Sequence, residues 1–220
     1  MEINDQIQIF RNIFNVPRET IEKLERYHEL IVSNQKKFNL IGKGTLESIW
    51  IRHFGDSAKL LKRVLYYRKK FKTEHLEIID VGTGAGFPGV VFSVLVNDLK
   101  IKADISLIES NRKKCNFLEL VKIELGQSFK IFNSRAEEIT NITGNIIFSR
   151  AVAPLGRLFN ILVNLVNKES VLLLHKGKNW QKEIAESKKG WQFDYNIVKN
   201  DIVLDRSGGV TIEVMNLLRK

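Results

Sequence analysis

Short apolar runs and amphipathic runs alternate along the chain from residue 76 onward. Strand-like runs occupy residues 76–81, 103–110, 129–134, 145–150 and 170–177. Helix-like runs, with apolar residues at helical spacing, occupy residues 88–98, 111–126 and 155–167. This β-α-β-α order predicts an α/β fold with a mostly parallel sheet covered on both faces.

The two ends of the chain have different patterns. Residues 3–65 are predicted to be helical, with Thr20 as an N-cap and a break at 39–45 before a further helix. A basic linker, residues 66–75, follows. We therefore expect an N-terminal helical extension with its linker over residues 1–72 and one compact domain over residues 73–220.

The C-terminal part shows two strand-like runs in direct succession. They cover residues 191–201 and 210–218, and only the turn-forming sequence RSGG separates the second from the first. Because no helix lies between them, they predict an antiparallel hairpin at the edge of the sheet.

Four glycines crowd into the stretch IIDVGTGAGFPG, residues 78–89. Gly84, Gly86 and Gly89 fit the dinucleotide fingerprint G-x-G-x-x-G, whereas Gly82, Gly84 and Gly86 fit a shorter G-x-G-x-G. Glycine is costly unless the backbone needs a positive φ or a close approach. The cluster therefore predicts a turn that holds a nucleotide-like ligand.

Two carboxylates decide between the possible ligands. Asp80 lies two residues before the first glycine, where it would repel a pyrophosphate but attract the amino group of a methionine moiety. Glu109 ends the second strand, where an acid can accept hydrogen bonds from ribose hydroxyls. NAD and S-adenosylmethionine share the ribose, so Asp80 is the discriminating residue, and it favours S-adenosylmethionine.

The composition agrees with a polyanionic partner. The chain has 35 Lys and Arg against 25 Asp and Glu, a formal charge of +10, which favours nucleic acid. One cysteine and four scattered histidines give no zinc-ligand spacing, so no metal is expected. The lone cysteine, the absence of a signal-like start and the shortness of the apolar runs predict a cytoplasmic protein without a membrane span.

The glycine stretch resembles motif I of class I methyltransferases. Together with RHFGDS (52–57), LIESNRKK (107–114), NSRAEE (133–138), FSRA (148–151) and LHKG (174–177), it resembles the bacterial small-subunit ribosomal RNA guanine-N7 methyltransferases, once called glucose-inhibited division protein B. The resemblance implies a class I, Rossmann-like, seven-stranded sheet with a reversed C-terminal strand. It also implies methyl transfer from S-adenosylmethionine to N7 of a guanine in 16S ribosomal RNA.

The resemblance also implies a set of site residues. Gly82, Gly84 and Gly86 would let the cofactor approach the backbone, and Phe87 would lie along it. Asp80 would face the methionine amino group and Glu109 the ribose, while Ala136 and Glu137 would bracket the adenine. Arg150 would stand at the mouth where the methyl group is transferred, as a cofactor contact and positioning residue.

Guanine N7 carries a lone pair and no proton, so its methylation needs alignment rather than a general base. The chain lacks the Asp/Asn-Pro-Pro-Tyr/Phe motif of amino-group methyltransferases, and Cys115 lies on a helix face, which argues against thiolate chemistry. The candidate RNA contacts are His53, Arg112, Lys113, Lys114 and Lys176, each with a structural alternative. His53 could instead close the extension onto the sheet, and Lys176 could be an ordinary exposed lysine.

Two other functions remain open from the sequence. An NAD-dependent oxidoreductase would use the G-x-G-x-x-G alternative, and a non-catalytic RNA-binding or ribosome-assembly module would use only the basic surface. The expected partner is the small ribosomal subunit, and the expected oligomeric state is a monomer.

Overall fold

A computed structural model of the protein describes residues 1–150, 152–198 and 209–220. Its seven-stranded sheet has the order β3-β2-β1-β4-β5-β7-β6, in which β7 runs antiparallel to both neighbours and all other pairs are parallel. The strands are β1 (Leu76–Val81), β2 (Ala103–Ile108), β3 (Lys130–Phe132), β4 (Ile146–Arg150), β5 (Val171–Lys176), β6 (Trp191–Val198) and β7 (Val210–Arg219). The predicted parallel sheet with a C-terminal antiparallel hairpin is confirmed.

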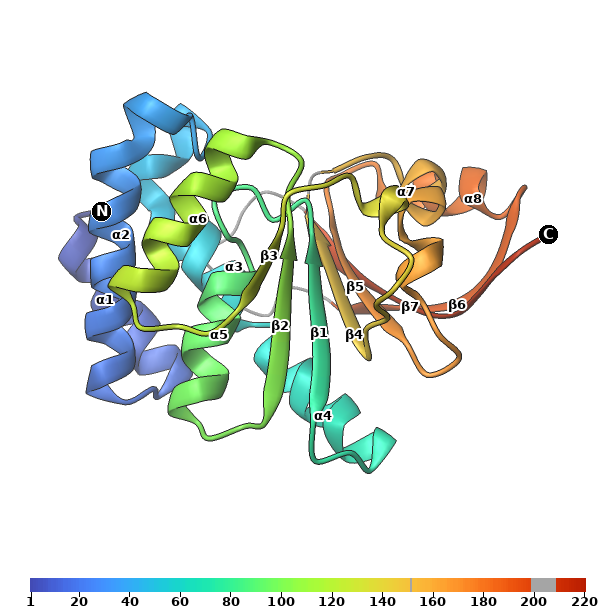
Figure 1. The fold of residues 1–220 in the computed structure, drawn as a ribbon, viewed down its shortest axis with the longest axis horizontal. Coiled ribbons are helices and arrows are strands. Elements are labelled where there is room, and N and C mark those ends of the chain that lie inside the picture. Colours follow the sequence, from blue (N-terminus) through green and yellow to red (C-terminus); the bar gives the residue numbers. More distant parts are fainter. Residues whose placement is uncertain (151, 199–208) are drawn as a thin grey trace.

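Helices cover the sheet on both sides (Figure 1). On one side lie α1 (Ile3–Phe14), α2 (Arg18–Phe38), α4 (Leu61–Phe71), α5 (Gly89–Asp98) and α6 (Arg112–Glu124). On the other side lie α7 (Leu155–Leu162) and α8 (Trp180–Ser187). Short helical turns cover Lys43–Ser48, Trp50–Gly55, Asp56–Ala58 (α3), Ala136–Glu138 and Val163–Leu165.

The alternation of side chains along the strands divides the core into two layers. In β1, Ile78 packs into the layer below the N-terminal helices, whereas its neighbour Ile79 packs into the layer below α7. Successive strand residues point to opposite faces, so a strand buried on both sides needs an unbroken apolar run. Five of the six residues of β1 are buried, Asp80 among them, and Glu77 is exposed.

The N-terminal helices differ from the expectation in three places. The helical stretch is broken at residues 15–17, and Pro17, not Thr20, precedes α2. Thr20 is fully buried, and its hydroxyl donates to Asp98 Oδ2 at 2.8 Å. Much of the expected linker is helical, because α4 continues to Phe71. Val64 and Tyr67 of this helix are buried in the core.

One further difference lies toward the C-terminus. The helix α8 was not predicted, although Ile184 and Ser187 bury one of its faces. The described part of the first hairpin strand ends at Val198, and most of the RSGG turn lies outside the described residues.

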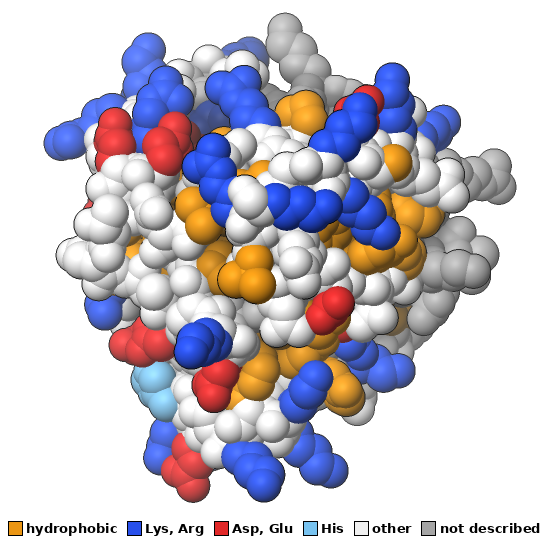
Figure 2. All heavy atoms as spheres, turned by 90° about the vertical axis from the view of Figure 1, so that its right-hand side faces the viewer, with side chains coloured by type: hydrophobic (Ala, Val, Ile, Leu, Met, Phe, Trp, Pro, Cys, Tyr) orange, Lys and Arg blue, Asp and Glu red, His pale blue; other side chains and the backbone are white. Residues whose placement is uncertain are grey.

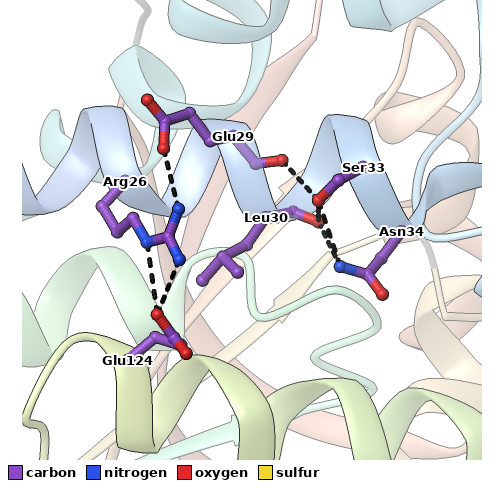
Figure 3. Close-up of polar contacts among 6 residues, drawn as sticks. All are labelled: Arg26, Glu29, Leu30, Ser33, Asn34 and Glu124. Carbon is purple, nitrogen blue, oxygen red and sulfur yellow. Dashed lines mark hydrogen bonds and ion pairs between the residues drawn. The ribbon is translucent and has the colours of Figure 1, made fainter.

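Helix α2 is fixed to two helices that follow the sheet strands. Lys23 pairs with Asp98 at the end of α5, with 2.5 Å between Nζ and Oδ1. Arg26 pairs with Glu124 at the end of α6 and with Glu29 on its own helix, as Figure 3 shows. Buried side chains of α2 and of the sheet belong to one continuous apolar cluster. The division at residue 72 stays a prediction.

Candidate cofactor site

A hollow of about 190 Å³ opens where β1 and β2 end, beside the segment that follows β4. Four of the predicted site residues line it, namely Gly82, Glu109, Ala136 and Glu137. The remaining lining residues are Val81, Ile108, Ser110, Ser134, Arg135, Val152, Ala153, Arg157 and Ile161. The carboxyl ends of parallel strands are the usual place for a ligand in such sheets.

The glycine turn after β1 needs the freedom of glycine at three positions. Gly82, Gly84 and Gly86 have φ values of +68°, +61° and +108°. A Cβ on Gly82 would stand 2.3 Å from Val152 Cγ2, whereas a Cβ on Gly84 would meet no atom closer than 3.9 Å. The backbone at Gly84 is therefore open to a ligand.

Gly86 is enclosed by protein rather than open. A Cβ there would stand 2.4 Å from Val90 Cγ2 and 2.7 Å from the hydroxyl oxygen of Tyr27. Its missing side chain makes room for packing, and this differs from the predicted approach of a cofactor to the backbone at this position.

Asp80 lies beneath the glycine turn and is fully buried. Its Oδ2 accepts hydrogen bonds from the Thr83 hydroxyl at 2.6 Å and from the Gly89 amide at 2.8 Å. Burial raises the pKa of Asp80 to about 7, although both hydrogen bonds act in the opposite direction. The structure does not bring this carboxylate to the hollow, and it holds the turn in place instead.

Glu109 reaches the hollow from the end of β2. Its Oε2 accepts from the Gly84 amide at 3.0 Å, and its Oε1 accepts from the Asn111 amide at 2.7 Å. A carboxylate offers about four lone-pair sites, so each oxygen keeps one for a further donor. Glu109 thus fixes the turn and can still accept a hydroxyl of a ligand.

Phe87 and His53 lie together, away from the hollow. Their ring centroids are 4.9 Å apart, and Phe87 is 5% exposed between Tyr27 and Phe54. The predicted contact of Phe87 along a cofactor is therefore not seen in this arrangement, because the N-terminal helices cover the ring.

His53 is half-buried, and its Nε2 lies 2.9 Å from Thr45 Oγ1. Burial, reinforced by the positive charges of Arg150 and Arg52, lowers the pKa of His53 to about 3. A neutral imidazole in this position favours the structural alternative, in which His53 packs the N-terminal extension against the sheet.

Arg150 ends β4, as expected, but it does not line the hollow. Its Nη2 donates to the Arg52 carbonyl oxygen at 2.9 Å and lies 3.7 Å from Asp56 Oδ2. It borders a smaller cavity of about 20 Å³ that Pro88 and His175 also line. The strand end is thus tied to the helical turn Trp50–Gly55.

Lys176 is buried, which corrects the expectation of an exposed lysine. Its Nζ contacts Glu183 Oε2 and the Ala153 carbonyl oxygen, each at 2.6 Å. Glu183 also accepts from the Leu155 amide at 2.8 Å. The pair of Lys176 and Glu183 therefore fixes the segment around Ala153 and Leu155, which passes along the hollow. Because Lys176 is buried, it has little exposed surface with which to bind a phosphate.

The start of α6 presents the other predicted basic residues. Asn111 caps this helix by accepting from the amides of Lys113 and Lys114. Arg112 and Lys113 are exposed and Lys114 is half-buried. Cys115, on the inner face of α6, is 5% exposed and belongs to the core.

The basic excess is not confined to α6. Figure 2 shows Lys and Arg side chains spread over the face that carries the C-terminal edge of the sheet, with hydrophobic side chains exposed between them. None of the described helices is both long enough and apolar enough to cross a membrane.

The residues around the hollow fit an adenosine-type ligand. Glu109 can accept from ribose hydroxyls, Gly82 supplies a bare backbone, and Ala136 supplies a buried apolar wall at 4% exposure. Sequence reasoning missed two cations on this wall, Arg135 and Arg157. Arg135 lies inside the quoted segment NSRAEE, whereas nothing in the sequence pattern singles out Arg157.

Comparisons with known proteins agree with this geometry. A variant of MtNAS solved in complex with S-adenosylmethionine superposes with a TM-score of 0.59 over 95% of this chain and 77% of that chain, at 13% identity, which shows a shared fold. Ribosomal RNA small subunit methyltransferase G of Rickettsia felis is 36% identical over 94% of this chain and 99% of its own length. The Rickettsia typhi protein of the same name is 38% identical over 93% and 98%. The sequence model of GidB, rRNA small subunit methyltransferase G, matches residues 20–207, and the chain therefore belongs to this family of S-adenosylmethionine-dependent methyltransferases.

Proposed function

We propose that this protein transfers a methyl group from S-adenosylmethionine to N7 of a guanine in 16S ribosomal RNA of the small subunit. The observation that carries the proposal is the hollow at the ends of β1 and β2, with Glu109 and Gly82 of the glycine turn on its wall. The family match and the basic charge support the choice of substrate.

The adenosine part of the cofactor is assigned to the hollow. Glu109 accepts from the ribose hydroxyls, and Ala136 and Glu137 flank the base. Gly84 allows the ligand to lie against the backbone, because an added Cβ there would meet no protein atom closer than 3.9 Å, whereas the Cβ position of Gly82 is filled by Val152. Asp80 acts through the turn, because it anchors Thr83 and Gly89 from below.

Bound S-adenosylmethionine supplies an electrophilic methyl group. The protein has to align this group with the lone pair of N7 and accommodate the charge that moves onto the purine. N7 has no proton to remove, so the chain needs no general base. Arg150 is assigned to the mouth of the site, where its guanidinium positions the substrate after release from the Arg52 carbonyl oxygen.

The RNA is assigned to the basic surface beside the hollow. Arg112 and Lys113 project from the start of α6, next to Lys114. Such cations bind phosphates without reading sequence. His53 and Lys176 belong to this proposal as residues that shape the site, because Lys176 is buried and His53 is half-buried against Phe87. A cytoplasmic monomer acting on the subunit or its precursor is the simplest form.

The test is methyl transfer from labelled cofactor to small subunits that lack the modification, with the product nucleosides separated by mass. Label in 7-methylguanosine supports donor, target atom and substrate together. Label in another nucleoside contradicts the N7 assignment. Absence of label from the subunit, despite binding of S-adenosylhomocysteine, contradicts the choice of substrate.

A further inference from the structure

Helix α2 reaches the glycine turn through a single buried hydroxyl. Tyr27 is fully buried, and its hydroxyl donates to the Ala85 carbonyl oxygen with 2.5 Å between the two atoms. These residues are 58 positions apart in the sequence. A carbonyl in the middle of a tight turn has no strand partner, so this hydrogen bond satisfies it.

The ring of Tyr27 adds packing to this hydrogen bond. Its centroid lies 5.3 Å from that of Phe87 and 5.5 Å from that of Phe54. The hydroxyl oxygen also fills the space beside Gly86, where a Cβ would stand 2.7 Å from it. Tyr27 thus contacts the turn at Ala85, Gly86 and Phe87.

The part of α2 that carries Tyr27 is itself held firmly. Thr20 and Lys23, up to two turns before it, bind Asp98 of α5. Arg26, directly before it, binds Glu124 of α6 (Figure 3). The helix is therefore a fixed support, and the hydroxyl of Tyr27 is placed by contacts outside the turn.

We infer that Tyr27 is a positioning residue that holds the glycine turn in the shape that receives the cofactor. The inference rests on the proposed function, since it concerns the same site. Two residues then hold the turn from different elements: Glu109, after β2, accepts from the Gly84 amide, and Tyr27, in α2, donates to the Ala85 carbonyl oxygen. The contact of Tyr27 connects the N-terminal extension to cofactor binding.

The chain offers a matched control for testing this role. Tyr67 also lies in the extension, is 1% exposed, and donates its hydroxyl to a residue of the sheet, Glu213 in β7. Tyr67→Phe removes the same atom from a site without contact to the glycine turn. Both Tyr27→Phe and Tyr67→Phe should therefore lower the free energy of unfolding.

Only Tyr27→Phe should weaken cofactor binding. We expect its Kd for S-adenosylhomocysteine, measured by calorimetry, and its KM for S-adenosylmethionine to rise about tenfold, the effect of one lost buried hydrogen bond. The kcat at saturating cofactor should stay within about twofold, because the reacting groups are untouched. Hydrogen exchange at the amides of Gly86 and Phe87, which donate to the Thr83 carbonyl oxygen, should become faster.

An unchanged Kd in a folded Tyr27→Phe protein would overturn the inference and leave the proposed function intact. A wild-type protein that binds no S-adenosylhomocysteine would overturn both. A second measurement uses the wild-type chain and so needs no variant to fold. The four tyrosines are replaced by fluorotyrosine and observed by ¹⁹F NMR. The signal of Tyr27 should shift on binding S-adenosylhomocysteine while that of Tyr67 stays, and a fixed Tyr27 signal would contradict the inference.

Discussion

The carboxylate of Asp80 at the end of β1 accepts a hydrogen bond from the amide of Gly89 at the start of α5, with 2.8 Å between Oδ2 and N. The same oxygen accepts from the Thr83 hydroxyl. One buried atom therefore closes the glycine turn from both ends, and the other oxygen, Oδ1, has no partner among the described residues.

Removing this carboxylate should open the turn. Asp80→Ala leaves the Gly89 amide buried without an acceptor, a cost of about 1–3 kcal/mol. We expect calorimetry to find no binding of S-adenosylhomocysteine, while filter binding finds RNA affinity nearly unchanged. An equal loss of RNA affinity would mean that the whole fold, and not the turn, had failed.

The ionisation of Asp80 should appear in the pH dependence of stability. Because the folded-state pKa is raised from 3.8 to about 7, the folded protein binds more protons than the unfolded chain between these values. The contribution of this group to the free energy of unfolding therefore falls as pH rises from about 4 to about 7. Denaturant unfolding measures the free energy of unfolding of the wild type and of Asp80→Asn. The value for the wild type, relative to that for Asp80→Asn, should fall as pH rises over this range. A constant difference would contradict the raised pKa.

Gly84 and Gly126 form a matched pair for testing ligand approach. Their φ values are +61° and +60°, and neither has an atom closer than 3.9 Å to an added Cβ. Alanine at either position should cost about 1 kcal/mol of stability through the left-handed backbone. Only Gly84→Ala should raise the Kd for S-adenosylhomocysteine, by about tenfold or more, and equal Kd values in calorimetry would place the cofactor elsewhere.

His53 should not act as a cation toward RNA. Its pKa is lowered to about 3, so the ring stays neutral throughout the working range, which NMR titration of its Cε1–H between pH 5 and 8 can check. His53→Gln should lower stability by about 1 kcal/mol and leave the salt dependence of RNA binding unchanged. A shallower salt dependence in the variant would show that the ring is charged in the complex.

The start of α6 should contribute phosphate contacts. Replacing Arg112 and Lys113 together by Glu should weaken RNA binding and reduce the slope of log K against log salt by about 2. The Kd for S-adenosylhomocysteine should not change. Lys100 and Lys102, exposed residues before β2 at the opposite end of the sheet, give the control double variant. Equal losses in the two double variants would indicate an effect of net charge alone.

The ion pair between Arg63 and Glu213 should stabilise the join between α4 and the sheet. Glu213 is fully buried, whereas Arg63 is 27% exposed. Arg63→Met should lower the free energy of urea unfolding by about 2–4 kcal/mol, because it leaves a buried charge without its cation. The exposed pair of Arg18 and Glu22 is the control, and Arg18→Met should cost less than about 1 kcal/mol. Tyr67 and Asn196 also donate hydrogen bonds to Glu213, and a similarly small loss in Arg63→Met would mean that these two suffice to hold its carboxylate.

The order of strands and helices from β1 to β5 could be predicted from the sequence alone, because the period of apolar residues and the position of glycines are local properties that neighbouring residues impose on the backbone. The sequence pattern also puts Glu109 directly after the second strand, and this is where the structure has it, on the wall of the hollow. Which side chains are covered depends on the fold. Phe87 is enclosed by Tyr27 and Phe54, and Lys176 donates to the Ala153 carbonyl oxygen, because residues far apart in sequence meet there. Exposure and pairing depend on such distant neighbours, and no local pattern specifies them.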